Sequence, residues 1–541
     1  MEDFANISAM IVEHNVGMRG NIRNMLAQCG INDVQPVGTA AAAIRKVQER
    51  PFDLILCEYH LGDGQDGQHF LEDLRNHGLI PLSTVFIMVT GESSYERVVG
   101  AVELAPNDYI LKPFTADQLY QRIARSLERR EALLPTYELI EIGDLQGALA
   151  LCLEGYQRHP PYAMDFLRLQ AQLLIGLGQP AQAQEAYQRV LEMRAVPWAR
   201  LGLAKALFLQ KRFGEAEQDL EALVAENRQY LDAYDWLART REATGRLREA
   251  QQVIEDAVAV SPHTVRRLKK LGDLAIETGD MKVAERVLTE VVRKGKYSDF
   301  RDPEDHVKLV KVFVAKGEPQ KAERTIRDLD RTMQGMEKTE ACSAISAAMV
   351  ATHAGDKEKA LAALNRAVAA ARTHSALSDA TMTDLARVCL DNAQQDAAEE
   401  VMGDVMRNAS DDATIEKAMG VFERAGLKSV GDNLAQKTRQ DVAELVKAGA
   451  KRAEEGDFQG SVDLMLQAVG KMPGNVQVGL NAALAVLKLI DNAGWDEHLA
   501  NRARALIDMG RQRDPGHPRI GALSTYFQQL LAKYGIQPAH A

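Results

Sequence analysis

Hydrophobic and polar positions follow two alternating patterns in the first 130 residues. Short, nearly continuous apolar runs, typical of strands buried on both faces, occupy residues 9–13, 33–37, 53–58, 84–90 and 108–111. Stretches with the apolar spacing of amphipathic helices lie between and after them, at residues 18–29, 40–48, 68–76, 93–104 and 116–130. This alternation predicts a doubly wound, five-stranded parallel α/β domain over residues 1–130, with its functional residues at the carboxyl ends of the strands.

The remaining chain has a helical texture with an internal repeat. A turn residue, usually Gly, is followed five positions later by a small residue, in eight clear copies. The small residues are Ala148, Ala183, Ala216, Ala250, Ala284, Ala322, Ala360 and Ser461. The first five follow one another at steps of 33 to 35, and the next two steps are 38. A period near 34 with two helices per unit resembles the tetratricopeptide repeat.

The repeat pattern predicts positive backbone φ at the turn residue and close helix packing at the small residue. Two degenerate copies are expected at 392–397 and 426–431. We therefore predict a superhelix of repeats over residues 131–470. Plain helices at 476–490, 498–512 and 519–534 follow, and we expect residues 471–541 to cap the last repeat. A separate binding module there is the alternative.

Composition narrows the classes of function. The net charge is -11, and neither the first 130 residues nor the remainder is basic, which argues against nucleic acid as a partner. The five cysteines are scattered, so neither a disulfide framework nor a zinc site is expected. No secretory signal and no apolar run of membrane-spanning length is found, so we expect a cytoplasmic protein without membrane insertion.

The predicted strand ends carry a set of polar residues within recognisable sequence motifs. The motifs are AMIVEHNVGMR, DLILCEYHLGDGQDGQHFLEDLR, FIMVTG and NDYILKPF. Together they resemble, in content and order, the receiver domain of bacterial two-component response regulators. The resemblance implies a site built from two acidic residues after strand one, a phosphoacceptor Asp after strand three, and Mg²⁺ held among these carboxylates.

The resemblance also assigns roles to residues of this chain. Thr90 matches the hydroxyl residue that contacts the phosphoryl group, Lys112 the conserved cation, and Tyr109 the switch aromatic. The acidic positions depart from the family, because Glu13 and His14 stand where two acids are expected and Glu58 stands in place of the acceptor Asp. A glutamate carries its carboxylate one methylene further out, and an imidazole is a poor Mg²⁺ ligand. We therefore predict weak Mg²⁺ binding, no other cofactor, and a pseudo-receiver.

Several alternatives stay open at this stage. A displaced acceptor such as Asp63 or Asp66 would keep the site phosphorylatable. Glu58 could mimic a phosphoryl group, or it could belong to a decayed site and simply pair with Lys112. Glu13, His14, Glu58 and His60 could instead bind a transition metal.

No motif of an enzyme is found in its proper context, so we predict a non-catalytic adaptor. Other proteins are expected to bind the concave face of the repeats. A phosphorylation-switched regulator controlled by a histidine kinase is the alternative. The helix at 116–130 runs into a short, charged helical junction at 129–135 without a Gly/Ser-rich linker, which indicates that the receiver is held firmly against the first repeat. Homodimerisation through the receiver face or the C-terminal helices is left open.

Overall fold

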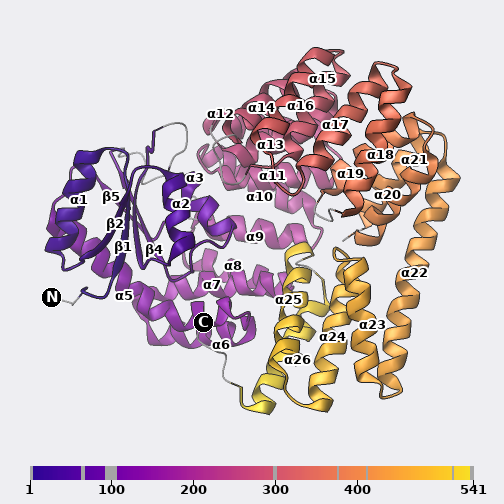
Figure 1. The fold of residues 1–541 in the computed structure, drawn as a ribbon. Helices are drawn as coiled ribbons and strands as arrows, with labels where there is room; N and C mark the ends of the chain where they lie inside the picture. The colour runs from indigo at the N-terminus through magenta and orange to yellow at the C-terminus, as the bar shows by residue number, and fades with distance from the viewer. Residues whose placement is uncertain are drawn as a thin grey trace. The chain divides into compact units, whose positions relative to one another are not determined.

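The computed structural model describes residues 4–62, 67–91, 106–262, 264–295, 301–373, 377–409, 412–514 and 517–536. Two compact units divide the chain between Leu274 and Ala275, within helix α13. The first unit holds an α/β domain and the first helix pairs of the array, and the second holds the later pairs (Figure 1).

The α/β domain is built on a parallel sheet of five strands in the order β2-β1-β3-β4-β5. Its strands are β1 (Ser8–Val12), β2 (Asp33–Val37), β3 (Leu54–Glu58), β4 (Val85–Thr90) and β5 (Asp108–Leu111). In register, Val12 pairs with Val37 and Cys57, and Thr90 pairs with Leu111. The carboxyl ends of β1, β3, β4 and β5 therefore meet at one edge, as the sequence predicts.

Helices cover both faces of this sheet (Figure 1). They are α1 (Val16–Gln28), α2 (Ala40–Glu49), α3 (Gly67–Asn76) and α5 (Ala116–Glu141). One face packs against α1 and α5 through buried aliphatic residues such as Ile11, Ile87 and Ile123. On the other face Phe70 of α3 packs against Phe86 of β4. The helix predicted at 93–104 lies outside the described residues.

Helix α5 is longer than the sequence predicts. It was expected to end at Arg130 but continues to Glu141, through Pro135, and forms the first helix of the array. The start of α5 is fixed by a capping box in which Thr115 and Gln118 exchange hydrogen bonds with each other's backbone. One continuous helix therefore joins the receiver to the repeats, and no flexible linker intervenes.

Helix pairs succeed one another along the array (Figure 1). In the first unit the helices are α6 (Leu145–Arg158), α7 (Ala163–Gly176), α8 (Pro180–Met193), α9 (Pro197–Leu209), α10 (Phe213–Glu226), α11 (Leu231–Ala243), α12 (Leu247–Val260) and the start of α13 (Val265–Thr278). In the second they are α14 (Met281–Gly295), α15 (Glu304–Ala315), α16 (Pro319–Thr332), α17 (Thr339–His353), α18 (Lys357–Thr373), α19 (Asp379–Asp391), α20 (Gln395–Asn408), α21 (Asp412–Arg424), α22 (Lys428–Glu454) and α23 (Phe458–Lys471).

The repeated turn has the backbone geometry that the sequence pattern predicts. A residue with φ between +56° and +84° ends the first helix of each pair from Gly143 to Gly456. Glycine occupies this position in all of these turns except two, where Lys211 and Ala393 adopt the same left-handed conformation. The small residues five positions later are buried in every predicted copy. The copy expected at 392–397 is displaced by one residue, because its turn is at Ala393 and its buried residue is Ala398.

Near residue 430 the regular alternation of helices changes. Helix α22 is a single helix of 27 residues, and two hydrophobic cores share it. Ala435 belongs to the core of the preceding helices, whereas Val442 belongs to the core of the following ones. No glycine or proline interrupts the sequence between Gly431 and Gly449, so nothing separates the two helices that a regular repeat would have here.

Three helices follow the array, α24 (Val476–Ala493), α25 (Glu497–Arg513) and α26 (Arg519–Tyr534), close to their predicted bounds. Leu480, Ile507 and Phe527 join them in one core with α23. Across the described ranges, no helix is both long and apolar enough to cross a membrane.

Candidate functional site at the strand ends of the receiver

A single lysine connects two buried carboxylates at the carboxyl edge of the sheet. Glu13 follows β1 and is 1% exposed, and Glu58 ends β3 and is 5% exposed. The Lys112 ammonium, which follows β5, donates to Glu13 Oε2 at 2.8 Å and also to Glu58 Oε2. The sequence therefore identified three residues that the fold brings together.

Electrostatics keep this cluster charged. Burial alone opposes ionisation of Glu13, but hydrogen bonds from Lys112 and the Asn15 backbone, with the Lys112 charge, hold the pKa of Glu13 below its usual range. Burial likewise disfavours the ammonium, yet the two carboxylates outweigh it and raise the pKa of Lys112. The cluster is thus one cation shared by two anions.

The other predicted site residues surround this cluster in different ways. Thr90 is fully buried at the end of β4, and its carbonyl accepts a bond of 2.7 Å from the Lys112 backbone. His14 is half exposed, with Nδ1 3.3 Å from Glu13 Oε1. Tyr109 is half buried on β5, and the Arg122 guanidinium lies 5.7 Å from its ring centroid.

Asn15, Arg19 and Gly67 support the site and were not identified from the sequence, and His60 supports it through its backbone rather than as a metal ligand. The Asn15 backbone donates to Glu13 Oε1, and Arg19 donates to the Glu13 carbonyl at 2.7 Å. The His60 backbone donates to Glu58 Oε1 at 3.1 Å. A Cβ at Gly67 would lie 2.6 Å from the Glu58 carbonyl, so only glycine fits there. The glycine within the acceptor-loop motif was the available signal.

The donor set suits a metal poorly. In the described part of the chain, no three His, Cys, Asp or Glu side chains are placed to hold an ion. The alternative of a transition-metal site at Glu13, His14, Glu58 and His60 stays an untested hypothesis. The two carboxylates that do meet are both engaged by Lys112, which is a poor arrangement for the oxygen ligands that Mg²⁺ needs. Asp63 and Asp66, the displaced acceptors, lie outside the described residues.

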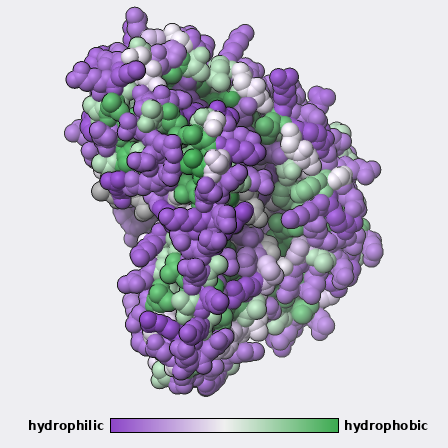
Figure 2. All heavy atoms as spheres, turned by 90° about the vertical axis from the view of Figure 1, so that its right-hand side faces the viewer, coloured by the Kyte–Doolittle hydropathy of each residue, from purple (hydrophilic) through white to green (hydrophobic). Residues whose placement is uncertain are grey.

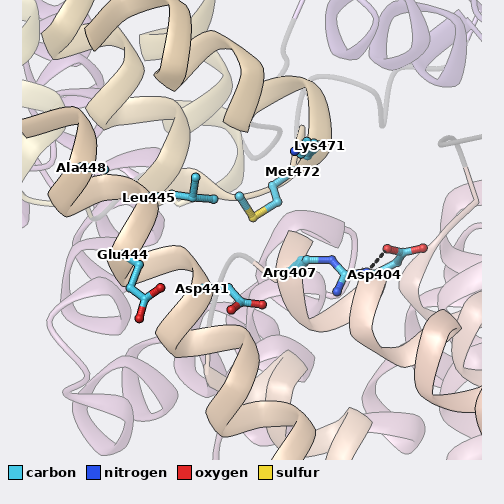
Figure 3. A pocket seen from close by; sticks show the side chains of 8 residues that line it. All are labelled: Asp404, Arg407, Asp441, Glu444, Leu445, Ala448, Lys471 and Met472. Carbon is cyan, nitrogen blue, oxygen red and sulfur yellow. Dashed lines mark hydrogen bonds and ion pairs between the residues drawn. The ribbon is translucent and has the colours of Figure 1, made fainter. Parts of the chain in front are cut away.

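A second feature is a groove in the later repeats, of about 710 Å³, between α20, α22 and α23 (Figure 3). Leu445, Ala448 and Met472 supply its apolar lining. Its charged lining comprises Asp404, Arg407, Asp441, Glu444 and Lys471. Arg407 and Asp404 form an ion pair. An apolar strip with a charged rim can take a peptide segment.

The surrounding surface is mainly polar. Figure 2 shows a face on which hydrophilic side chains predominate and hydrophobic ones lie in small groups between them. Apolar groups scattered over a polar face are normal for a protein surface and do not by themselves mark a binding site.

Comparisons with known proteins agree with this domain organisation. Residues 9–124 match the response regulator receiver domain, and residues 168–230 and 207–271 match tetratricopeptide repeat models. The chemotaxis protein CheY-3 of Vibrio cholerae is 27% identical over 124 residues, which cover 23% of this chain and 94% of CheY-3. The KDP operon transcriptional regulatory protein KdpE of Escherichia coli is 25% identical over 226 residues, 41% of this chain and 94% of KdpE.

Solved repeat structures show weaker similarity. A tetratricopeptide repeat protein from Parabacteroides merdae is 15% identical with a TM-score of 0.31, covering 48% of this chain and 97% of that one. The C-terminal part of a repeat protein from Cytophaga hutchinsonii is 14% identical with a TM-score of 0.32, covering 43% and 92%. The family matches and the fold described above identify a response regulator receiver domain followed by tetratricopeptide repeats.

Proposed function

We propose that this protein is a non-catalytic signalling adaptor whose receiver is not phosphorylated at the usual position and whose repeats bind other proteins. The observation that carries the proposal is the direct pairing of Lys112 with Glu58 and Glu13. The resemblance assigns Lys112 to a phosphoryl group, but here a glutamate already occupies it. No DNA-binding output is proposed, because the receiver leads into repeats that favour protein partners.

Chemistry at Glu58 supports a pseudo-receiver. Phosphoryl transfer requires the acceptor oxygen in line with the leaving group and a cation on the transferred oxygens. Glu58 Oε2 is held by Lys112 and Oε1 by the His60 backbone, so both oxygens already accept hydrogen bonds. The half-exposed His14 supplies no carboxylate to complete a Mg²⁺ site. The Glu58–Lys112 pair then holds the receiver in one state.

Labelling with acetyl phosphate tests the receiver half of this proposal. The full-length wild type, with Mg²⁺, is expected to gain no phosphoryl group by intact-mass measurement. A variant with His14→Asp and Glu58→Asp restores the family residues and serves as the positive comparison. Stoichiometric, Mg²⁺-dependent labelling of the wild type would overturn the proposal and favour the alternative, a regulator switched by a histidine kinase through an unusual acceptor.

Direct binding tests the adaptor half. A protein captured from cells by the wild type must bind the purified full chain and lose affinity when Leu445→Glu places a charge in the groove lining. Leu153→Glu, at an exposed leucine of α6, is the matched control. Equal loss with both variants, or catalytic turnover of any captured molecule, would contradict the adaptor function.

A further inference from the structure

Helix α3 of the receiver is buried on both of its faces. Phe70, Leu71 and Leu74 form its inner face. With 3.6 residues per turn, His69 and Glu72 lie on the opposite side, which a receiver alone would expose to solvent. Yet both are only 8% exposed. Polar residues are rarely buried this far without partners, so something must cover the outer face of α3.

The cover comes from the junction of α12 and α13 in the same compact unit. His69 Nε2 hydrogen-bonds Thr264 Oγ1, and Ser261 Oγ lies 3.4 Å from the same nitrogen. Ser261 and Thr264 are also 3.1 Å apart, so the three side chains form one polar cluster. The contact joins residues almost 200 positions apart in sequence, between the receiver and the start of α13.

A buried arginine extends this contact. Arg267 on α13 is 1% exposed, and it donates to both carboxylate oxygens of Asp235 on α11. Burial opposes its charge, but Asp235, Glu72 and Asp232 outweigh burial and raise the pKa of Arg267. Glu72 is the receiver's contribution to this set. The array therefore places a buried charged side chain, that of Arg267, near Glu72 of α3.

The receiver meets the array at a second place. The Leu82 backbone donates to Glu141 Oε1 at 2.7 Å, at the end of α5. Arg129, on the receiver part of α5, pairs with Asp165 on α7. The receiver thus contacts both α7 and α13, which are the first helices of their pairs. Helices α7, α9 and α11 contact one another in sequence and form a continuous row.

We propose that α3 is an intramolecular ligand of this row, and that the docked receiver closes the row from α7 to α13 to protein partners. In repeat arrays the first helices line the surface that takes partners. The described hydrogen bonds between α3 and the array are made by polar side chains, and such contacts can open without unfolding either element. A partner of these repeats and the docked receiver are then mutually exclusive.

Hydrogen exchange of the full-length protein tests this docking. Glu72→Arg sets a second cation against the buried Arg267, and Thr264→Arg makes the corresponding change from the array side. Each is expected to raise exchange at residues 264–268 and at the first turn of α7 by at least about tenfold, because an uncompensated buried charge is costly. Exchange in β1, β3 and β4 should stay unchanged. Glu49→Arg, on the exposed end of α2, is the matched control.

Two results would overturn the proposal. One is unchanged exchange in both variants, which would mean that α3 does not cover the row. The other is faster exchange throughout the sheet, which would mean that the contact is part of one inseparable core. The inference goes beyond the adaptor function, and its test uses no phosphodonor and no partner. The two can therefore fail separately.

Discussion

The receiver and the repeat array each bury glutamates against a lysine, but they support them differently. At the receiver strand ends, Lys112 pairs with both Glu13 and Glu58. Each glutamate also accepts one backbone N–H, from Asn15 and from His60 respectively. In the second unit, Glu304 on α15 accepts from Lys338 at 2.7 Å, from the backbone and hydroxyl of Ser378, and from Thr381 Oγ1 at 2.5 Å. In the receiver, two glutamates share one lysine. In the array, one glutamate accepts hydrogen bonds from several donors.

The difference shows how much each region depends on individual side chains. In an array, stability is a sum of similar local terms, and Glu304 keeps several hydrogen bonds if one is lost. Among the described residues of the receiver, Lys112 is the one cation that pairs with both carboxylates. A buried Glu–Lys pair is therefore not by itself a sign of a functional site. The strand-end position of the receiver pair gives it that meaning.

Removing the lysine from each site gives the largest expected contrast. Lys112→Met leaves two buried carboxylates without their ammonium, which should destabilise the receiver by about 3–5 kcal/mol. Lys338→Met leaves Glu304 with its Ser378 and Thr381 donors, and should cost about 1–3 kcal/mol. Hydrogen exchange in β1 and β3 measures the first, and exchange in α15 and α19 measures the second.

Lys46→Met controls for loss of a surface ammonium, since Lys46 pairs only with the exposed Glu49, and it should change stability by less than about 0.5 kcal/mol. A smaller cost for Lys112→Met than for Lys338→Met would break the comparison. It would mean that Glu13 and Glu58 are protonated or hydrated once the lysine is gone.

Most of the fold could be predicted because its signals are local. A continuous apolar run rich in β-branched residues, such as 84–90, predicts a buried strand. The turn glycines likewise mark the boundary within each helix pair. The sequence predicted a helix to Arg130 followed by a short helical junction, but α5 is one helix that continues through Pro135 to Glu141. That continuity depends on packing of Leu133 and Tyr137 in the core of the first repeat. Such tertiary support overrides a local breaker and leaves no trace in the pattern.

The site residues were predictable only where their position at a strand end determines where they lie in the fold. Glu13, Glu58 and Lys112 follow strand ends, so topology alone brings them together. The docking of α3 could not be predicted, because His69 and Thr264 are ordinary polar residues whose contact depends on how the four helix pairs between them pack. Gly67 could be read from the sequence as a loop residue, but not as one pressed against the Glu58 carbonyl.

A partly buried carboxylate on α3 sharpens the comparison through its pH dependence. Burial raises the pKa of Asp73 on α3 to about 6, although His77, His69 and Arg266 oppose the shift and Glu72 adds to it. The folded protein then holds a proton that the unfolded chain has released. Stability contributed by this group is complete below about pH 4 and is lost as pH rises to about 6.

Asp73→Asn cannot ionise, so the variant should be more stable than the wild type at pH 7 by about 1–2 kcal/mol, with the difference vanishing near pH 4. Denaturation of both proteins across this range measures the effect. Glu13 behaves oppositely, because its pKa is lowered and its contribution is lost as pH falls. A wild type and variant that differ equally at pH 4 and 7 would show that the pKa of Asp73 is not raised in the folded protein.

The smallest expected effect lies in the array, where the same turn is repeated. Lys211 and Ala393 hold a left-handed conformation that glycine holds in the other turns, with φ of 61° and 56°. A side chain in this region costs about 1–2 kcal/mol, partly offset by the greater freedom of glycine in the unfolded chain. Lys211→Gly should therefore stabilise the protein by about 0.5–1 kcal/mol, and Ala393→Gly by a similar amount.

Lys211→Ala is the matched control, because it removes the exposed ammonium and keeps the strained backbone, and it should leave stability nearly unchanged. The reverse change, Gly245→Ala at φ 77°, should cost about 1 kcal/mol. Thermal unfolding followed by the fluorescence of Trp198 and Trp236 covers both turns of the first unit. If Lys211→Gly and Lys211→Ala stabilise equally, the gain comes from charge rather than backbone. Backbone strain would then not distinguish Lys211 from the glycine turns. The evidence that the array differs from the receiver would come only from the hydrogen bonds around Glu304.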